Sequence, residues 1–109
     1  MSAALGEFEQ IVLLAILRLG DAAYAVSIRR EIAARTGREP APGALYTTLD
    51  RLEEKRLVTS RRGDPTPQRG GRAKRYFKVS AKGISAVARV QRSYRNLMEG
   101  LVLPGVAHA

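Results

Sequence analysis

The sequence predicts a mainly α-helical fold that carries one small β-hairpin. Over most of the 109 residues, apolar side chains recur every three or four positions, which is the period of a helix packed on one side. After Leu57 the period changes to two, which is typical of a strand with one buried face. Between two strand-like runs stands a segment rich in Pro and Gly that cannot be helical. A chain of this length forms one domain with a modest core.

Two helices are expected at the start of the chain. The first covers residues 6–19 and is apolar over most of its circumference, so it must be buried on more than one side. The second covers residues 24–36, with apolar side chains every four residues and arginines facing outward. Gly20 and Gly37 follow these helices directly, where a left-handed residue commonly ends a helix.

A third helix is expected over residues 42–56. Pro42 suits its first turn, where the missing N–H costs nothing. Leu45, Leu49 and Leu52 then form one apolar face at spacings of four and three. A short Gly-containing turn joins this helix to the one before it. The pair therefore predicts a helix-turn-helix, in which the third helix is the candidate recognition helix.

The hairpin is predicted from residues 57–60 and 76–79. Val58, Phe77 and Val79 are its inward positions, because alternate residues of a strand face the same side. A hairpin that directly follows a helix-turn-helix is a wing. Residues 1–79 are therefore expected to form a winged helix-turn-helix domain that binds DNA.

Ser80 is expected to cap a last helix. Residues 80–103 are interpreted as a C-terminal dimerisation helix, and residues 104–109 as a flexible tail. The apolar stripe of this helix finds little uncovered surface on the closed three-helix core, and each large apolar side chain left in water forfeits about 1.5–3 kcal/mol. The simplest resolution is a two-fold homodimer, in which this helix packs on the first helix and on its own copy. The predicted interface residues are Ile11, Leu14, Ile84, Val87, Tyr94, Leu97 and Leu101.

The positive charge of the chain is local. The formal net charge is +9, yet the first 60 residues balance eight Lys and Arg with eight Asp and Glu. Residues 61–78 hold seven Lys and Arg and one acidic residue, Asp64. Such an excess predicts an acidic partner, and double-stranded DNA is favoured because the basic segment stands beside a helix-turn-helix. A membrane is not expected as the partner, because a segment with Gly and Pro forms no amphipathic helix.

The exposed face of the third helix is the expected reader of base edges. Thr47, Thr48 and Arg51 are predicted to contact bases or nearby phosphates. Hydroxyl groups bond either target, and the Arg guanidinium pairs bidentately with guanine. The alternative for Arg51 is a surface ion pair with Glu54 on the same helix.

Three further residues of this helix are predicted to contribute to DNA binding. The Tyr46 ring is expected to pack inside while its hydroxyl meets a phosphate, and a purely core position stays open. Gly43 lets the N-terminus of the helix approach a phosphate, or else serves the geometry of the preceding loop. Lys55 is expected to contact a phosphate.

The wing is expected to supply most of the charge that meets the phosphates. Its glycines allow the backbone to come close to the duplex, and a flanking Arg could enter a narrow minor groove. The alternative is a solvated basic loop that binds nothing. The predicted DNA contacts of the wing are Arg69, Gly70, Arg72, Lys74 and Arg75.

Several function classes are disfavoured by what the sequence lacks. Without Cys there is no disulfide, thiolate metal site or Cys nucleophile, and the sole His, His108, lies in the tail. The phosphate-binding motif G-x-x-x-x-G-K-[ST] is absent as well. No enzyme, catalytic residue, metal site or cofactor is therefore expected. The longest apolar run, residues 11–17, is far shorter than the ~20 residues that span a bilayer, and a cytoplasmic location is expected.

Five segments, in this order, carry a resemblance to a known family. They are residues 5–9 (LGEFE), 44–53 (ALYTTLDRLE), 57–58 (LV), 69–77 (RGGRAKRYF) and the Ser80-x-x-Gly83 start of the last helix. In this set the chain resembles the PadR family of bacterial winged helix-turn-helix transcriptional regulators, in its short form with one C-terminal helix. The resemblance implies a homodimer that binds an inverted-repeat operator, usually as a repressor. It also implies that the third helix enters the major groove beside the wing.

Relatives in that family that bind flat aromatic drugs use a Trp near the dimer interface. This chain has no Trp, so a small-molecule inducer is left unknown. The alternative function is a winged-helix RNA-binding or protein-interaction module. RNA recognition usually relies on exposed aromatic rings that stack on bases, and only six aromatic residues occur here.

Overall fold

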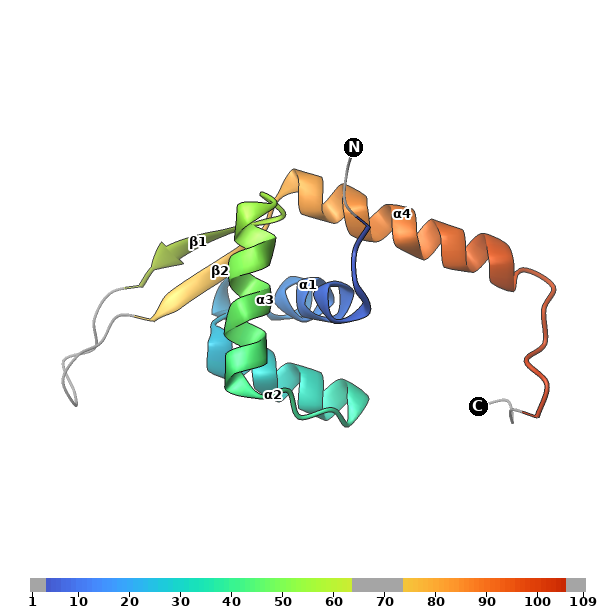
Figure 1. Cartoon of the computed structure of the whole chain (residues 1–109), viewed down its shortest axis with the longest axis horizontal. Helices are drawn as coiled ribbons and strands as arrows, with labels where there is room; N and C mark the ends of the chain where they lie inside the picture. The colour runs from blue at the N-terminus through green and yellow to red at the C-terminus, as the bar shows by residue number, and fades with distance from the viewer. Residues whose placement is uncertain (1–3, 64–73, 106–109) are drawn as a thin grey trace.

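Four α-helices and one antiparallel hairpin make up the part of the chain that the computed structural model describes, residues 4–63 and 74–105. Figure 1 shows α1 at the centre with α2 and α3 beside it, the hairpin on one side and α4 on the other. This arrangement confirms the predicted fold class, a winged helix-turn-helix with a C-terminal helix. In chain order the elements are α1 (Glu7–Leu19), the 3₁₀ helix η1 (Gly20–Ala22), α2 (Ala25–Thr36), α3 (Pro42–Glu54), β1 (Val58–Arg62), β2 (Arg75–Val79) and α4 (Ala81–Met98).

The core forms around α1. This helix contacts α2, α3, β2 and α4, so its burial on several sides is confirmed and explains its apolar circumference. The side chains that fill the core come from every element except η1, at the spacings that the sequence predicts. The most fully buried of them are Val12, Leu13, Ile16, Ile28, Ile32, Leu45, Leu49, Leu52 and Val58.

The ends of the first three helices follow local backbone preferences. Gly20 (φ 59°) and Gly37 (φ 74°) adopt the positive φ values that favour glycine, and each directly follows its helix as expected. Pro42 stands in the first turn of α3. The end of α3 differs from the prediction, since the helix stops at Glu54 and not at residue 56. Arg56 has a left-handed φ of 63°, which turns the chain out of the helix and into β1.

A compact junction joins α4 to the residues that follow α3. Ser80 caps α4 as predicted, because its Oγ accepts a hydrogen bond from the Gly83 amide at 3.0 Å. The same hydroxyl donates to the Arg56 carbonyl at 2.7 Å. The Ser80 amide donates to the Leu57 carbonyl at 2.9 Å. The start of α4 is therefore fixed to the end of the helix-turn-helix.

The predicted C-terminal limit of the last helix, residue 103, is wrong. α4 ends at Met98, because Glu99 leaves the helical region (ψ 124°) and Gly100 takes a left-handed φ of 72°. Leu101, which was expected on the apolar stripe of the helix, lies beyond it in a turn where its amide donates to the Met98 carbonyl at 2.9 Å.

The hairpin has the register that the alternation predicts. Val58 pairs with Val79 and Ser60 pairs with Phe77. Val58, Phe77 and Val79 are buried, so the predicted inward positions are confirmed. The Gly63 amide donates to the Lys74 carbonyl at 2.7 Å, which continues the ladder past the last residues of the two strands.

A short third segment completes the sheet, and the sequence did not predict it. The Phe77 amide donates to the Ala23 carbonyl at 2.8 Å, and Tyr24 forms an isolated antiparallel bridge with Tyr76. Because the bridge involves one residue, it leaves no period-two pattern in the sequence. It places the start of α2 directly against the wing.

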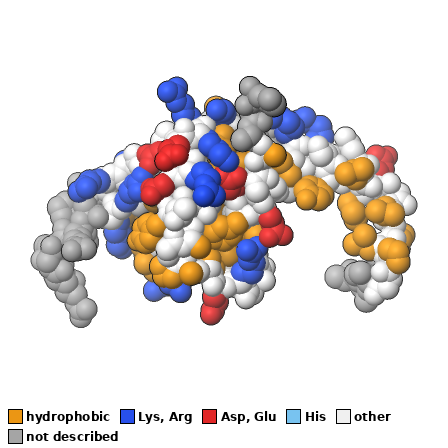
Figure 2. Space-filling model, viewed as in Figure 1, with side chains coloured by type: hydrophobic (Ala, Val, Ile, Leu, Met, Phe, Trp, Pro, Cys, Tyr) orange, Lys and Arg blue, Asp and Glu red, His pale blue; other side chains and the backbone are white. Residues whose placement is uncertain are grey.

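α4 extends away from the core beyond its first turns. All residues from 91 to 105 are exposed, and the structure measures 55 × 35 × 22 Å. Its radius of gyration is 16.1 Å, against about 13 Å for a compact domain of this length. Figure 2 shows hydrophobic side chains gathered along α4 and the segment after it, on the concave side of the molecule. Within the described residues, nothing covers this apolar surface.

Candidate nucleic-acid interface

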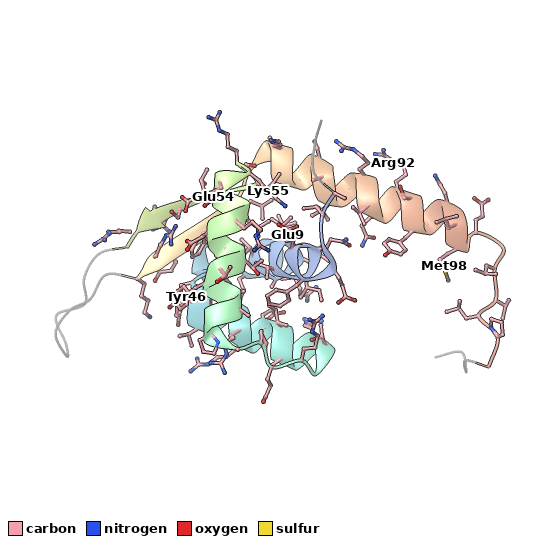
Figure 3. The ribbon with its side chains drawn as sticks, viewed as in Figure 1. Glu9, Tyr46, Glu54, Lys55, Arg92 and Met98 are labelled. Atoms are coloured by element: carbon pink, nitrogen blue, oxygen red, sulfur yellow. The ribbon has the colours of Figure 1, made fainter. Side chains whose placement is uncertain are left out.

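The surface of α3 that faces away from the core carries most of the predicted base-reading residues. Tyr46 is 51% exposed, and Figure 3 shows it pointing away from the helix bundle. Its ring is therefore not a core side chain. Thr47 and Arg51 are exposed on the same helix, and Gly43 is exposed in its first turn. Arg51 makes no ion pair within residues 4–63 and 74–105, so the alternative pair with Glu54 does not form there.

Thr48 does not fit the role that was predicted for it. It is buried, with 7% of its surface exposed. The reason is its position on the helix, three residues after Leu45 and four before Leu52, which places it on the same face as these core leucines. With so little of its surface exposed, Thr48 is removed from the set of candidate base contacts.

The turn between α2 and α3 is held from both sides. Arg29 of α2 donates through Nε to the Pro40 carbonyl at 2.9 Å. Arg38 donates through Nη1 to Glu7 Oε1 at 2.9 Å, and its guanidinium carbon lies 5.3 Å from the centre of the Phe8 ring. These contacts fix the N-terminus of α3 relative to α1 and α2, which a recognition helix requires.

Lys55 was predicted to contact a phosphate, but the structure gives it an internal partner. Its Nζ lies 2.7 Å from Glu9 Oε2 on α1, in a pair that is largely shielded from solvent. Glu9 Oε1 accepts the Gly6 amide at 2.9 Å, so both carboxylate oxygens are occupied. Figure 3 shows Glu9 and Lys55 approaching each other between the two helices. Lys55 therefore links α3 to the start of α1.

This pair predicts how stability depends on pH. Burial raises the pKa of Glu9. The hydrogen bonds from Lys55 and Gly6 and the charges of Lys55 and Arg51 lower it by more than burial raises it, so the pKa of Glu9 lies below the ordinary 4.5. A depressed folded pKa stabilises the fold above the unfolded pKa, and this stabilisation is lost as pH falls through the folded value. Glu9→Gln is therefore expected to flatten the fall of the melting temperature between about pH 5 and pH 3. Glu39→Gln, at an exposed acid, should keep the wild-type profile, and identical profiles for all three proteins would contradict the role of Glu9.

The outer face of the wing holds cations on aromatic rings. Lys74 Nζ lies 4.3 Å from the centre of the Tyr24 ring, and Arg61 Cζ lies 4.8 Å from the centre of the Tyr76 ring. The two tyrosines meet edge to face at 5.6 Å between ring centres. A ring positions a cation without cancelling its charge. The predicted residue Lys74 is thus held ready for an anion, as is Arg61, which the sequence reasoning missed.

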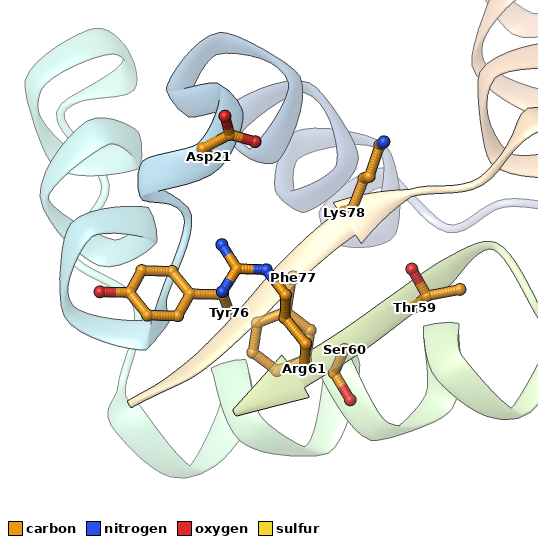
Figure 4. Close-up of a pocket in the computed structure, with 7 residues that line it drawn as sticks. All are labelled: Asp21, Thr59, Ser60, Arg61, Tyr76, Phe77 and Lys78. Atoms are coloured by element: carbon orange, nitrogen blue, oxygen red, sulfur yellow. The ribbon is translucent and has the colours of Figure 1, made fainter. Parts of the chain in front are cut away.

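A small pocket of about 100 Å³ opens on this same face of the wing. Figure 4 shows Arg61 and Lys78 beside it, with one acid, Asp21, at its edge. Both cations belong to the basic segment of residues 61–78, so the excess of Lys and Arg in that segment was the feature of the sequence that could have identified them as candidate contacts. Alternation already places Lys78 outward, between the inward residues Phe77 and Val79, whereas Arg61 lies one residue beyond the predicted strand of residues 57–60.

The inner face of the wing carries its cation differently. Arg75 was predicted to contact DNA, yet it pairs with Asp50 and Glu53 of α3. Its Nε also donates to Ser60 Oγ of β1 at 3.3 Å. With two carboxylates beside it, the positive charge of Arg75 is cancelled locally, and the prediction of a phosphate contact does not fit this position. The other predicted wing contacts, Arg69, Gly70 and Arg72, lie outside the described residues.

The predicted dimer residues differ in how much of their surface is exposed. Ile84 (50%), Tyr94 (61%) and Leu97 (76%) are exposed on α4, and Leu14 is 39% exposed on α1, while Ile11 is half-buried. Leu101 is 53% exposed but lies beyond the helix. Val87 is buried at 8% within the core of its own chain, because α4 rests on α1 there, and it is not an open interface residue. Exposed apolar residues that the prediction omitted are Leu17, Met98, Val102 and Leu103.

Membrane-spanning helices and metal-binding clusters are both absent from the described ranges. No helix there is long and apolar enough to cross a membrane. In the same residues, no group of three or more His, Cys, Asp and Glu side chains is arranged to hold a metal ion.

The fold is similar to that of several solved structures. A PadR family transcription regulator from Clostridium difficile R20291 superposes with a TM-score of 0.69 at 22% identity, over 85% of this chain and 93% of that one. A PadR-like transcription factor from Bacteroides fragilis gives 0.69 at 25% identity, over 85% and 84%. F93 from STIV, a winged-helix DNA-binding protein, gives 0.67 at 17% identity, over 87% and 95%.

No curated protein matches the chain in sequence. The family described as "Transcriptional regulator PadR-like family" matches residues 13–89, which run from the middle of α1 to the middle of α4. This match covers most of the chain and includes the helix-turn-helix and the wing. The chain therefore belongs to the PadR-like family of transcriptional regulators.

Proposed function

We propose that two copies of this chain form a homodimer that binds double-stranded DNA at an inverted repeat and represses transcription. The observation that carries the proposal is the pairing of an exposed, polar α3 surface with a wing whose outer cations keep their charge. A helix of this kind reads base edges in the major groove, while cations beside it hold the phosphates. Because the chain belongs to the PadR-like family of transcriptional regulators, control of transcription is the role proposed for this surface.

In this proposal, α3 provides the contacts that specify sequence. Arg51 is exposed and pairs with the O6 and N7 atoms of a guanine, and Thr47 bonds a neighbouring base or phosphate. Tyr46 brings an exposed ring and a hydroxyl to the same groove. The first free backbone amides of α3, at Gly43 and after it, bind a phosphate. They are available because no side chain caps this end of the helix, and Pro42 itself has no N–H to donate.

The wing provides contacts that depend on charge and not on sequence. Lys74 and Arg61 are positioned by the tyrosines and meet phosphates next to the groove that α3 occupies. Arg69, Gly70 and Arg72, which lie outside the described residues, are proposed as further contacts on the strength of the sequence alone. Each neutralised phosphate releases a counterion, so binding by this wing weakens as salt rises.

The dimer is proposed from the apolar surface of α4. Tyr94 and Leu97 lie on a part of α4 that rests on nothing within the described chain, and Ile84, in the first turn of α4, is half exposed beside the core. A second copy that packs against this surface by two-fold symmetry would cover it. Two recognition helices would then be presented together, which matches the symmetry of an inverted repeat.

The test begins with selection of bound sequences from a random duplex pool by the purified protein. An inverted repeat with half-sites about one helical turn apart is expected. Affinity for it should fall by roughly 10³–10⁵ between 50 and 200 mM salt, if 6–10 phosphates are neutralised. A pool without enrichment, or structured RNA that competes as well as duplex DNA, would contradict the proposal.

Two substitutions separate base reading from phosphate binding. Arg51→Ala is expected to relax preference at one position of each half-site by about 1–3 kcal/mol. Lys74→Ala should weaken all duplexes alike and lower the salt slope by about one. Arg92→Ala is the matched control, since Arg92 is an exposed arginine of α4 that points away from α1. If Arg51→Ala keeps the wild-type base preference, α3 is not the reading element in the way proposed.

A further inference from the structure

The recognition helix carries acidic groups close to the surface that DNA would approach. Asp50 and Glu53 both belong to α3, and their side chains are 61% and 36% exposed. Carboxylates beside a phosphate backbone repel it, and in an interface such contacts oppose binding strongly. A helix of this kind needs something that cancels these charges if it is to bind a polyanion tightly.

Arg75 meets both carboxylates from the wing. Its Nη1 lies 3.3 Å from Asp50 Oδ1, and its Nη2 is paired with Glu53 Oε1. Its Nε donates to Ser60 Oγ at 3.3 Å, so all three guanidinium nitrogens have a partner. The Ser60 hydroxyl in turn donates to Glu53 Oε2 at 2.7 Å. The guanidinium carbon also lies 4.9 Å from the centre of the Phe77 ring, which supports it from the core side.

This network joins three elements of the fold, and Arg75 is 15 residues from Ser60 and 25 from Asp50 in sequence. Arg75 lies on β2, Ser60 on β1, and the two carboxylates on α3. Because a guanidinium has a fixed planar shape, satisfying three directions at once also fixes the distance and angle between the wing and the helix. The wing is therefore held against α3 by a charge contact beyond the buried core.

The neighbouring cation of the wing is arranged in the opposite way. Lys74 rests on the Tyr24 ring and has no carboxylate partner in the described part of the chain. Two adjacent basic residues, on opposite faces of one strand end, thus differ in what surrounds them. Lys74 can therefore bind an external anion, whereas Arg75 is already paired with carboxylates of the same chain.

We propose that Arg75 is a positioning residue for DNA recognition, which screens Asp50 and Glu53 and fixes the wing against α3 without contacting DNA itself. The inference rests on the proposed function, because it explains how that same surface binds a duplex. Exposed ion pairs add little to folding stability. Loss of Arg75 should accordingly change DNA binding far more than the melting temperature.

The test is a rescue experiment on the selected operator duplex. Arg75→Gln is expected to weaken binding by about tenfold or more, because two carboxylates then face the phosphates unscreened. Asp50→Asn with Glu53→Gln should bind at least as tightly as wild type. Adding Arg75→Gln to that pair should cost no more than about threefold, since nothing is left for Arg75 to screen. The matched control is Lys74→Gln, whose loss should persist in the Asp50→Asn, Glu53→Gln background.

Two results would overturn the inference. One is a loss from Arg75→Gln that is as large with the neutral α3 as with the acidic α3, which would indicate direct phosphate contact. The other comes without DNA: amide NMR shifts of Asp50 and Glu53 on α3 that stay unchanged in Arg75→Gln would show that Arg75 does not hold the wing against α3. If the wild-type protein binds no duplex, the proposed function fails, whereas the DNA-free measurement still judges the network.

Discussion

A variant with both Tyr94→Asp and Leu97→Asp is expected to be a folded monomer that no longer binds a duplex with two half-sites. These side chains are 61% and 76% exposed in the single chain. A two-fold interface contains each substitution twice, so four large side chains lose burial worth about 1.5–3 kcal/mol each, and the new charges must be desolvated. The start of α4 should stay in place, because Ser80 and Val87 hold it.

Sedimentation of the two proteins at matched concentrations measures this effect, and circular dichroism confirms that the helices remain. Arg92→Asp is the control, because it places the same kind of charge on the side of α4 that points away from α1. It is expected to remain dimeric. A wild-type chain that sediments as a monomer, or a double variant that still sediments as a dimer, would remove α4 from the proposed interface.

Gly83→Ala is expected to give the largest loss of stability among single methyl additions. An added Cβ would lie 2.2 Å from the Leu57 carbonyl oxygen and 2.7 Å from Val79 Cγ1. The carbonyl is backbone, and it already accepts the Ser80 amide at 2.9 Å, so it cannot move without breaking the junction. Overpacking of this kind costs typically 1–3 kcal/mol, and we expect a value at or above the upper end.

Thermal unfolding provides the measurement, with an expected fall of the melting temperature of about 10 °C or more. The control is Gly43→Ala in the first turn of α3, where an added Cβ meets nothing within 4 Å. That substitution should be neutral or stabilise the protein by up to about 1 kcal/mol, because alanine has the lower entropy in the unfolded chain. Equal melting temperatures for the two variants would show that α4 can move away from the hairpin at little cost.

The helices and the hairpin could be predicted because their signals are local. Leu45, Leu49 and Leu52 mark one face of α3 whatever lies opposite, and Val58 and Phe77 mark the inner side of the hairpin by alternation alone. The glycines at the helix ends add a backbone preference that does not depend on tertiary context. Family membership could be inferred for the same reason, since the matching segments keep their order along the chain.

The roles of individual charged residues could not be predicted in the same way. Lys55 meets Glu9 across 46 positions, and Arg75 meets Asp50 across 25. No periodicity in the sequence relates residues so far apart. A count of basic residues therefore cannot distinguish a side chain that is paired with a carboxylate from one that is free to bind a phosphate. Thr48 is a different case, because its spacing from Leu45 and Leu52 already placed it on the buried face.

Ser80 connects the proposed dimer contact to the residues that directly follow the proposed reading helix through two hydrogen bonds. Its hydroxyl and amide hold the Arg56 and Leu57 carbonyls, and the Lys82 ammonium reaches the Lys55 carbonyl at 3.1 Å. α4 is therefore joined rigidly to the residues that follow α3. In a dimer, a change in the angle between the two α4 helices would change the distance between the two α3 helices. A small molecule that separated the α4 helices would then disrupt the match to the operator without altering either DNA-binding domain.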